Sequence, residues 1–136
     1  MSVLVGVTLA LAIGLFATWV GFDRDRAFYP TVMIVIVLYY VLFAVMGGSA
    51  EALLSECLVG VPFVIASVAG FKKSPWWVVA ALAGHGVMDF FHPHLVTDPG
   101  VPDWWPSFCL AYDVVAAGYL AVLVVVRGRR GRAAAR

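Results

Sequence analysis

Long apolar stretches dominate the pattern of the chain, and short polar groups separate them. A helix needs about 20 mostly apolar residues to cross a hydrocarbon core about 30 Å thick. Five stretches approach this length, and each ends at charged residues, glycines or a proline, which are typical of turns. The pattern therefore predicts an all-α membrane bundle of five transmembrane helices, at about residues 3–22, 31–47, 50–71, 76–92 and 107–126.

Composition excludes a soluble domain. Of the 136 residues, 63% are hydrophobic and 12% are charged, whereas soluble domains are nearer about half apolar and about a quarter charged. We expect residues 1–126 to form a single transmembrane bundle and residues 127–136 to form a basic cytoplasmic tail. The lipid bilayer is the expected partner, nothing in the sequence indicates a nucleic acid, and a homo-oligomer stays open.

Basic residues predict the orientation of the bundle. Arg24 and Arg26 follow the first predicted span, Lys72 and Lys73 follow the third, and five arginines lie in the tail. With five spans, all of these residues lie on one side of the membrane, and cytoplasmic loops are enriched in lysine and arginine. The pattern predicts an external N-terminus, an internal C-terminus and a multi-pass protein of the inner (plasma) membrane.

Three ionisable residues fall within different spans at a similar predicted depth. At a helical rise of about 1.5 Å per residue, Glu56, His85 and Asp113 lie roughly 9–10 Å below the outer ends of their helices. A charge at the bilayer centre costs at least about 2.5–3.5 kcal/mol, so such groups usually face one another or a wet cavity. We expect a shared pocket in the outer half of the bundle. The alternative is a hydrogen-bonded cluster that only fixes helix packing.

The segment 84–94 carries the strongest indication of chemistry, because it holds all three histidines of the chain. His85, Asp89 and His92 share one helix face by their spacing of four and three. Imidazole and carboxylate groups bind zinc and other first-row divalent metals. His85 and His92 are about 10 Å apart along a straight helix, too far to hold one ion together. An ion would take His85 with Asp89, or Asp89 with His92, and Asp89 would bridge two.

Other residues extend this hypothesis. Glu56 and Asp113 would complete a deeper metal position, and His94, a weaker candidate, or Glu51 would complete a shallower one. A metal-free acid–base site remains an alternative. The cysteines at positions 57 and 109 lack metal-ligand spacing such as C-x-x-C, so we expect two buried apolar thiols.

Two connecting segments have simpler interpretations. The loop 94–106 is acidic and rich in proline, and it is either a connector anchored by tryptophans or a lid over the pocket. The sequence Asp-Arg-Asp-Arg at 23–26 is expected to form a turn whose charges neutralise one another, without a catalytic role.

The stretches 21–30, 84–92 and 104–113 resemble a family of small, uncharacterised bacterial integral membrane proteins. This resemblance implies a multi-pass membrane protein. The alkaline ceramidases, which also hold zinc between helices with His and Asp, are similar in residue type and depth. The chain lacks their seven spans and their spacings, so no catalytic residue is carried over.

The leading hypothesis is a metal-dependent hydrolase that acts on an amphiphilic substrate entering from the outer leaflet. His85, Asp89, His92 and Asp113 would supply metal ligands, and Glu56 would be the general base that accepts a proton from a metal-activated water. Two alternatives remain open, a small cation or proton translocator and a non-catalytic membrane subunit.

Overall fold

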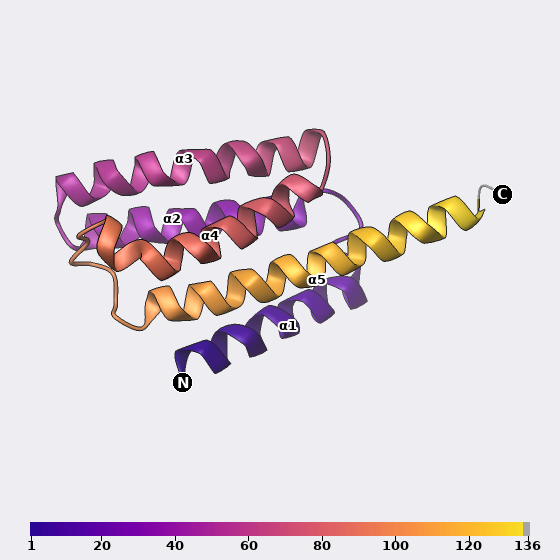
Figure 1. Cartoon of the computed structure of the whole chain (residues 1–136), viewed down its shortest axis with the longest axis horizontal. Coiled ribbons are helices and arrows are strands. Elements are labelled where there is room, and N and C mark those ends of the chain that lie inside the picture. Colours follow the sequence, from indigo (N-terminus) through magenta and orange to yellow (C-terminus); the bar gives the residue numbers. More distant parts are fainter. Residues whose placement is uncertain (135–136) are drawn as a thin grey trace.

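The computed structural model describes residues 1–134, which fold into five helices that run alternately up and down the bundle (Figure 1). The prediction of an all-α chain with five helices is confirmed. The N-terminus, the α2–α3 turn and the α4–α5 loop lie at one end, which we call the N-terminal end. The opposite end, where α5 leaves the bundle, is called the tail end. The helices are α1 (Ser2–Val20), α2 (Phe28–Met46), α3 (Ala50–Lys72), α4 (Trp76–Leu95) and α5 (Trp105–Ala134).

Proline positions explain two differences from the expected helix bounds. We expected the fourth span to stop at His92, but α4 continues through Pro93 to Leu95. Proline removes only the one hydrogen bond that its own N–H would donate, and the helix ends where the amide of Val96 donates to the carbonyl of His92 at 3.0 Å. Helix α2 begins before Pro30, in the first turn, where the N–H groups need no partner within the helix.

Helix α5 is longer than the predicted span 107–126. It begins at Trp105 and continues to Ala134, so most of the predicted basic tail is helical and extends beyond the bundle (Figure 1). Arginine and alanine are good helix formers, and the tail contains no proline to interrupt the helix. The last two residues of that predicted tail, 135–136, lie outside the described residues.

Helix α4 is the central element for the site. It packs against α3 on one side and α5 on the other, while α2 packs on α3 and more lightly on α4. Helix α1 packs along α5 through small residues spaced about one turn apart, Gly6, Ala10, Gly14 and Ala17. A Cβ atom at Gly6 would overlap the carbonyl oxygen of Phe108. Small residues permit this close approach of two apolar helices.

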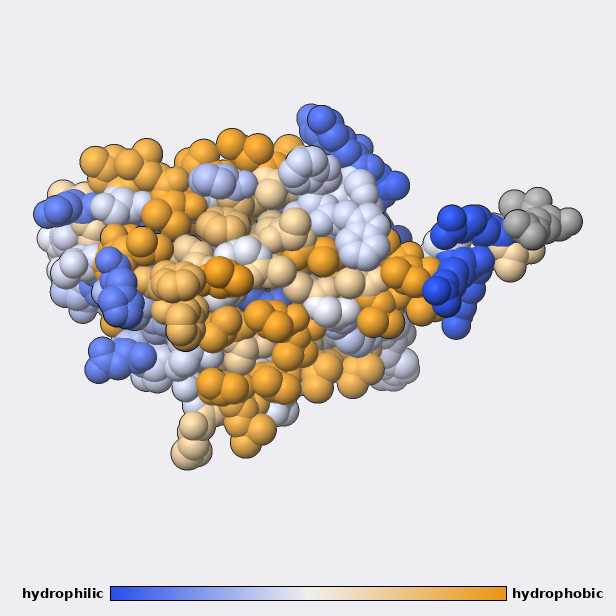
Figure 2. Space-filling view, viewed as in Figure 1, coloured by the Kyte–Doolittle hydropathy of each residue, from blue (hydrophilic) through white to orange (hydrophobic). Residues whose placement is uncertain are grey.

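The surface of the bundle is that of a multi-pass membrane protein. Large apolar side chains face outward along its middle, and hydrophilic residues gather at the two ends and along the tail (Figure 2). Helices α1, α2, α3 and α5 are long and apolar enough to cross a membrane. Helix α4 has 20 residues and is also largely apolar, but it carries His85, Asp89 and His92.

The turn at 23–26 does not neutralise itself as expected. Asp23 is buried and pairs with Arg127 of α5, at 2.9 Å between Oδ1 and a guanidinium nitrogen. Arg26 instead donates to the carbonyl of Lys73. The expectation was wrong because α5 continues past the predicted span, which brings Arg127 to the α1–α2 connection.

Candidate metal centre

One face of α4 carries the polar residues that the sequence singled out. His85, Asp89 and His92 recur at intervals of four and three, and each is 2% exposed or less. The same face continues toward the tail end as Val78, Ala81 and Leu82, which are part of the apolar core. The three polar side chains share the inward face of α4, as their spacing predicted, and the opposite face of the helix is turned outward.

His85 lies between two carboxylates. Its Nδ1 atom is 2.7 Å from Oδ2 of Asp113 on α5 and 3.3 Å from Oδ2 of Asp89 on its own helix. Gly86 makes this approach possible: a Cβ atom there would lie 3.3 Å from the Leu110 carbonyl oxygen and 3.4 Å from Asp113 Cβ. The predicted convergence of His85 and Asp113 at one level is therefore present in the fold.

Cys109 is the fourth member of the cluster, and the sequence reasoning missed it. Of the two thiols expected to be buried, Cys109 is buried and Cys57 is exposed. Donor atoms of His85, Asp89, Cys109 and Asp113 all lie within 4.8 Å of one another, and all four residues are buried. Among the described residues, no other such group of three or more potential ligands is found. The signal was the spacing of four between Cys109 and Asp113, which puts both on one face of α5.

Two carboxylate oxygens in this cluster have no hydrogen-bond partner. These are Oδ2 of Asp89 and Oδ1 of Asp113, both buried. Buried polar atoms are nearly always paired, and an unpaired one calls for an explanation such as a bound ion. Nitrogen, oxygen and thiolate donors suit zinc and related first-row metals. The donor set and the unpaired oxygens therefore fit a divalent metal ion.

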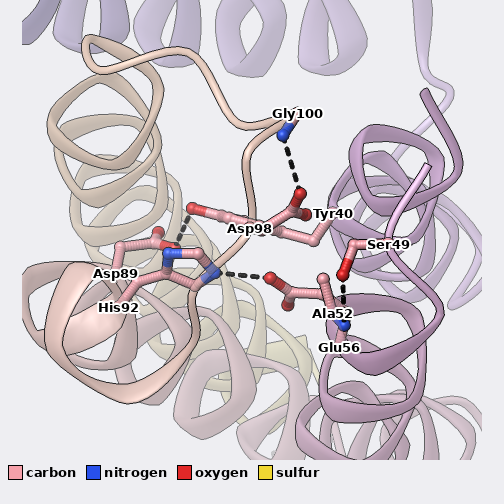
Figure 3. Close-up of polar contacts among 8 residues, drawn as sticks. All are labelled: Tyr40, Ser49, Ala52, Glu56, Asp89, His92, Asp98 and Gly100. Atoms are coloured by element: carbon pink, nitrogen blue, oxygen red, sulfur yellow. Dashed lines mark hydrogen bonds and ion pairs between the residues drawn. The ribbon is translucent and has the colours of Figure 1, made fainter. Parts of the chain in front are cut away.

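Tyr40 of α2 supports the cluster from the side. Its hydroxyl donates a hydrogen bond of 2.6 Å to Oδ1 of Asp89, and its ring lies 4.6 Å from the His92 ring, centroid to centroid (Figure 3). A hydrogen bond to a carboxylate that faces a metal fixes its orientation. Tyr40 thus determines which oxygen of Asp89 is turned toward His85.

Glu56 lies beside this cluster and is not part of it. Its Oε1 atom is 2.7 Å from Nε2 of His92, and both side chains are buried (Figure 3). A void of about 10 Å³, the space of about one water molecule, is lined by Glu56, Tyr40 and His85. The expected shared pocket is therefore divided into a His85–Asp89–Asp113–Cys109 cluster and a Glu56–His92 pair, with Tyr40 between them.

The shallower candidates do not join either group. His94 and Glu51 are exposed at the N-terminal end. The loop between α4 and α5 packs closely onto the end of α2. A Cβ atom at Gly100 would overlap the carbonyl of Phe43, so only glycine permits this contact. Asp98 accepts a hydrogen bond from the amide of Gly100 at 2.8 Å, so this acid stabilises the loop turn.

No family model, curated protein or solved structure matches this chain. The resemblance to small bacterial membrane proteins drawn from residues 21–30, 84–92 and 104–113 is therefore not supported by any matching family. What remains is the coarser conclusion, a multi-pass membrane protein with a buried group of His, Asp and Cys side chains that could hold a metal ion.

Proposed function

We propose that the chain is a membrane-embedded, metal-dependent hydrolase that acts on an amphiphilic substrate. His85, Asp89 and Asp113 hold zinc or another first-row divalent metal ion. The observation that carries the proposal is the pair of unpartnered carboxylate oxygens beside an imidazole inside an apolar bundle. A divalent cation would offset the negative charge that these two acids bring into the interior.

Three protein ligands distinguish a catalytic zinc site from a structural one. Structural sites close all four positions with protein donors, whereas catalytic sites leave one position for water. His85, Asp89 and Asp113 supply three donors, and Cys109 stands at the fourth position. A metal with a free position supplies an activated water at neutral pH. The hydrolase proposal therefore requires that the metal remain bound without the Cys109 thiol.

Glu56 is the proposed general base. The void that it lines together with His85 brings it within one water molecule of the cluster. His92 holds the Glu56 carboxylate through a hydrogen bond of 2.7 Å and orients it. In this proposal His92 positions the base, in place of the metal-ligand role expected from the sequence, and His94 has no part in the site.

The translocator alternative finds less support. A path for protons or cations would need polar groups between the cluster and the tail end. Of the buried polar side chains in the described part of the chain, Ser67 is the one in the tail-end half of α3, and its hydroxyl donates to the Phe63 carbonyl. Helices α4 and α5 bury apolar side chains over the same depth, among them Val78, Leu82 and Leu120.

Metal analysis of the purified protein tests the proposal. We expect about one equivalent of zinc in the wild type, retention of that metal in Cys109→Ser, and its loss in His85→Ala. Asp23→Asn, which changes a buried acid at the tail end, is the matched control and should keep its metal. Equally little metal in the wild type and in His85→Ala would remove the hypothesis. Metal lost in Cys109→Ser would indicate a closed, non-catalytic site.

We propose that all five helices cross the plasma membrane, with the N-terminal end outside. The basic residues of the α1–α2 connection, the α3–α4 connection and the tail support this orientation. A membrane-impermeant maleimide should label His94→Cys on intact cells and leave Arg132→Cys unlabelled until the cells are opened. The opposite pattern would reverse the orientation and place the site near the cytoplasm.

A further inference from the structure

An apolar groove of about 740 Å³ lies between α1, α2 and α5. The lining residues of each helix recur at intervals of three and four, so each helix lines the groove with one face. Helix α5 contributes the floor, at positions 105, 108, 109 and 112, and α1 contributes Leu9 and Ile13. The α2 wall consists of Phe28, Thr31, Val32, Val35, Ile36 and Tyr39. The groove is therefore a product of helical periodicity on three separate elements.

Packing of the neighbouring helices keeps this groove open. The small residues of α1 seat that helix against α5, and α2 packs with α3 and α4. A strip of the α5 surface is left between α1 and α2. Such a volume falls within the range of about 300–1,000 Å³ that is usual for small-molecule sites. In a membrane-spanning bundle the molecules available to fill it are hydrocarbon chains.

The two ends of the groove differ in chemistry. At the N-terminal end, Tyr39 and Trp105 form the rim, with their rings 5.2 Å apart. At the tail end, the lining includes Asp25. From Phe28 to Tyr39 the α2 wall is about 16 Å long at about 1.5 Å per residue, roughly half of a hydrocarbon core about 30 Å thick.

Cys109 connects the groove to the candidate metal centre. It lines the groove floor one turn from Trp105, and its sulfur is one of the four clustered donor atoms. A chain lying in the groove would therefore place its polar end, at Trp105, within about one helical turn, or about 5 Å, of that residue. The groove shares Cys109 with the cluster, whereas the tail-end cavity lined by Asp23 and Arg127 shares no residue with it.

We infer that this groove binds the hydrocarbon chain of a single-chain membrane amphiphile, with the polar end of that molecule at the rim formed by Tyr39 and Trp105. The chain points toward the tail end, and the head group lies beside Cys109. As the identity of the substrate, this inference rests on the proposed hydrolase; as a binding site, it stands on the groove alone. It assigns lateral entry from the bilayer, between α1 and α2, as the route to the site.

Photolabelling in nanodiscs tests the inference. The probe is lysophosphatidylcholine with a diazirine in its acyl chain, added to the protein in phosphatidylcholine discs and located by mass spectrometry of peptides. Label should concentrate on the groove residues of α1, α2 and α5, and excess unlabelled lysophosphatidylcholine should compete it away. Label spread evenly over outward-facing positions of all helices, or resistant to competition, would overturn the inference.

Two tryptophan variants provide the comparison. Val35→Trp fills the α2 wall of the groove, whereas Leu58→Trp adds the same side chain to an exposed position on α3 that does not line it. Groove labelling should be lost in Val35→Trp and retained in Leu58→Trp, with both variants unfolding near the wild-type temperature. Equal labelling of the two variants would contradict the inference.

Metal content separates this inference from the proposed function. Val35→Trp leaves the four donor residues unchanged, so it should carry as much zinc as the wild type while losing the label. A wild type that is labelled in the groove but carries no zinc would keep the lipid site and remove the hydrolase. A wild type that carries zinc but shows no label that unlabelled lysophosphatidylcholine can displace would remove the lipid site and keep the metal site.

Discussion

Two buried acidic groups lie toward opposite ends of the bundle, and they are satisfied in different ways. At the tail end, Asp23 accepts hydrogen bonds on both carboxylate oxygens, from Thr18 at 2.6 Å and from Arg127 at 2.9 Å. Arg127 also donates to the Asp23 carbonyl at 2.7 Å. In the cluster around His85, the imidazole is hydrogen-bonded to Oδ2 of Asp113 at 2.7 Å and lies 3.3 Å from Oδ2 of Asp89. Oδ2 of Asp89 and Oδ1 of Asp113 are left without a hydrogen-bond partner.

The difference indicates which group is built to receive a ligand. A buried carboxylate without compensation is costly, so the protein supplies Asp23 with a permanently charged arginine from its own chain. Within residues 1–134, no lysine or arginine forms an ion pair with the His85 cluster, which offers a soft sulfur donor instead. Protein groups complete the first arrangement, and a bound cation would complete the second.

Asp113→Asn should cause the largest loss of stability, because it removes a proposed metal ligand from the His85 cluster and leaves the Asp23–Arg127 pair intact. The variant loses a charged ligand, so we expect it to lose its metal together with the stability that the metal provides. A ligand at a thousand times its dissociation constant contributes about 4 kcal/mol. Thermal unfolding in detergent, with and without a chelator, measures this contribution.

Asp23→Asn is the matched control for that experiment. It removes a buried charge of the same type, but its chelator-dependent shift in unfolding temperature should equal that of the wild type. A shift that survives in Asp113→Asn would show that the metal binds elsewhere.

Arg127→Gln should have the next largest effect, and it should be independent of metal. The substitution leaves Asp23 buried without its cation, and an unsatisfied buried group costs about 1–3 kcal/mol. The value should lie at the lower end of this range because the Arg127 side chain is 42% exposed and therefore screened by solvent. The double variant Asp23→Asn/Arg127→Gln should recover most of the loss in urea unfolding. Additive losses would mean that the two residues are not coupled.

The sequence predicted the inward face of α4 because spacing along one helix fixes which residues share a face. His85 and Asp89 are four apart, and their burial followed directly. The sequence could not predict that Glu56 contacts His92 instead of Asp113. The direction in which Glu56 points depends on the rotation of α3 about its axis, which is set by side-chain packing against α2 and α4. Asp23 and Arg127 are 104 residues apart. Their pairing could not be predicted because the fifth span was expected to end at residue 126, just before Arg127, whereas α5 continues to Ala134.

Cys109 illustrates a different failure. Neither cysteine has the short spacing of known metal-binding cysteine motifs. A site assembled across two helices needs only one or two donors from each, at a spacing of three or four. Reading α5 in the same way as α4 would have paired Cys109 with Asp113 and so suggested the fourth donor.

Tyr40→Phe should have a smaller effect than Arg127→Gln when metal is bound, and a comparable effect when metal is absent. The change removes the hydroxyl that donates to Asp89 and leaves an additional carboxylate oxygen unpaired, which costs about 1–2 kcal/mol in the metal-free protein. A bound cation would compensate the charge of the Asp89 carboxylate, so the loss should be smaller in the metal-bound protein. Unfolding of the variant with and without zinc checks the expectation, and an equal loss under both conditions would argue against a metal at Asp89.

Glu56→Gln should have the smallest effect on stability, and it separates the base from the ligands. Glutamine keeps the shape of the side chain and an oxygen that can accept from the His92 ring, so we expect a loss of about 1 kcal/mol or less, of the order of one neutral hydrogen bond. Glu56 is not one of the four clustered donors, so the zinc content should equal that of the wild type. Hydrolysis of a lysophospholipid should nevertheless fall sharply if Glu56 accepts the proton. A variant that loses its zinc would place Glu56 among the ligands instead, and one that keeps both metal and hydrolysis would leave the Glu56–His92 pair with a structural role alone.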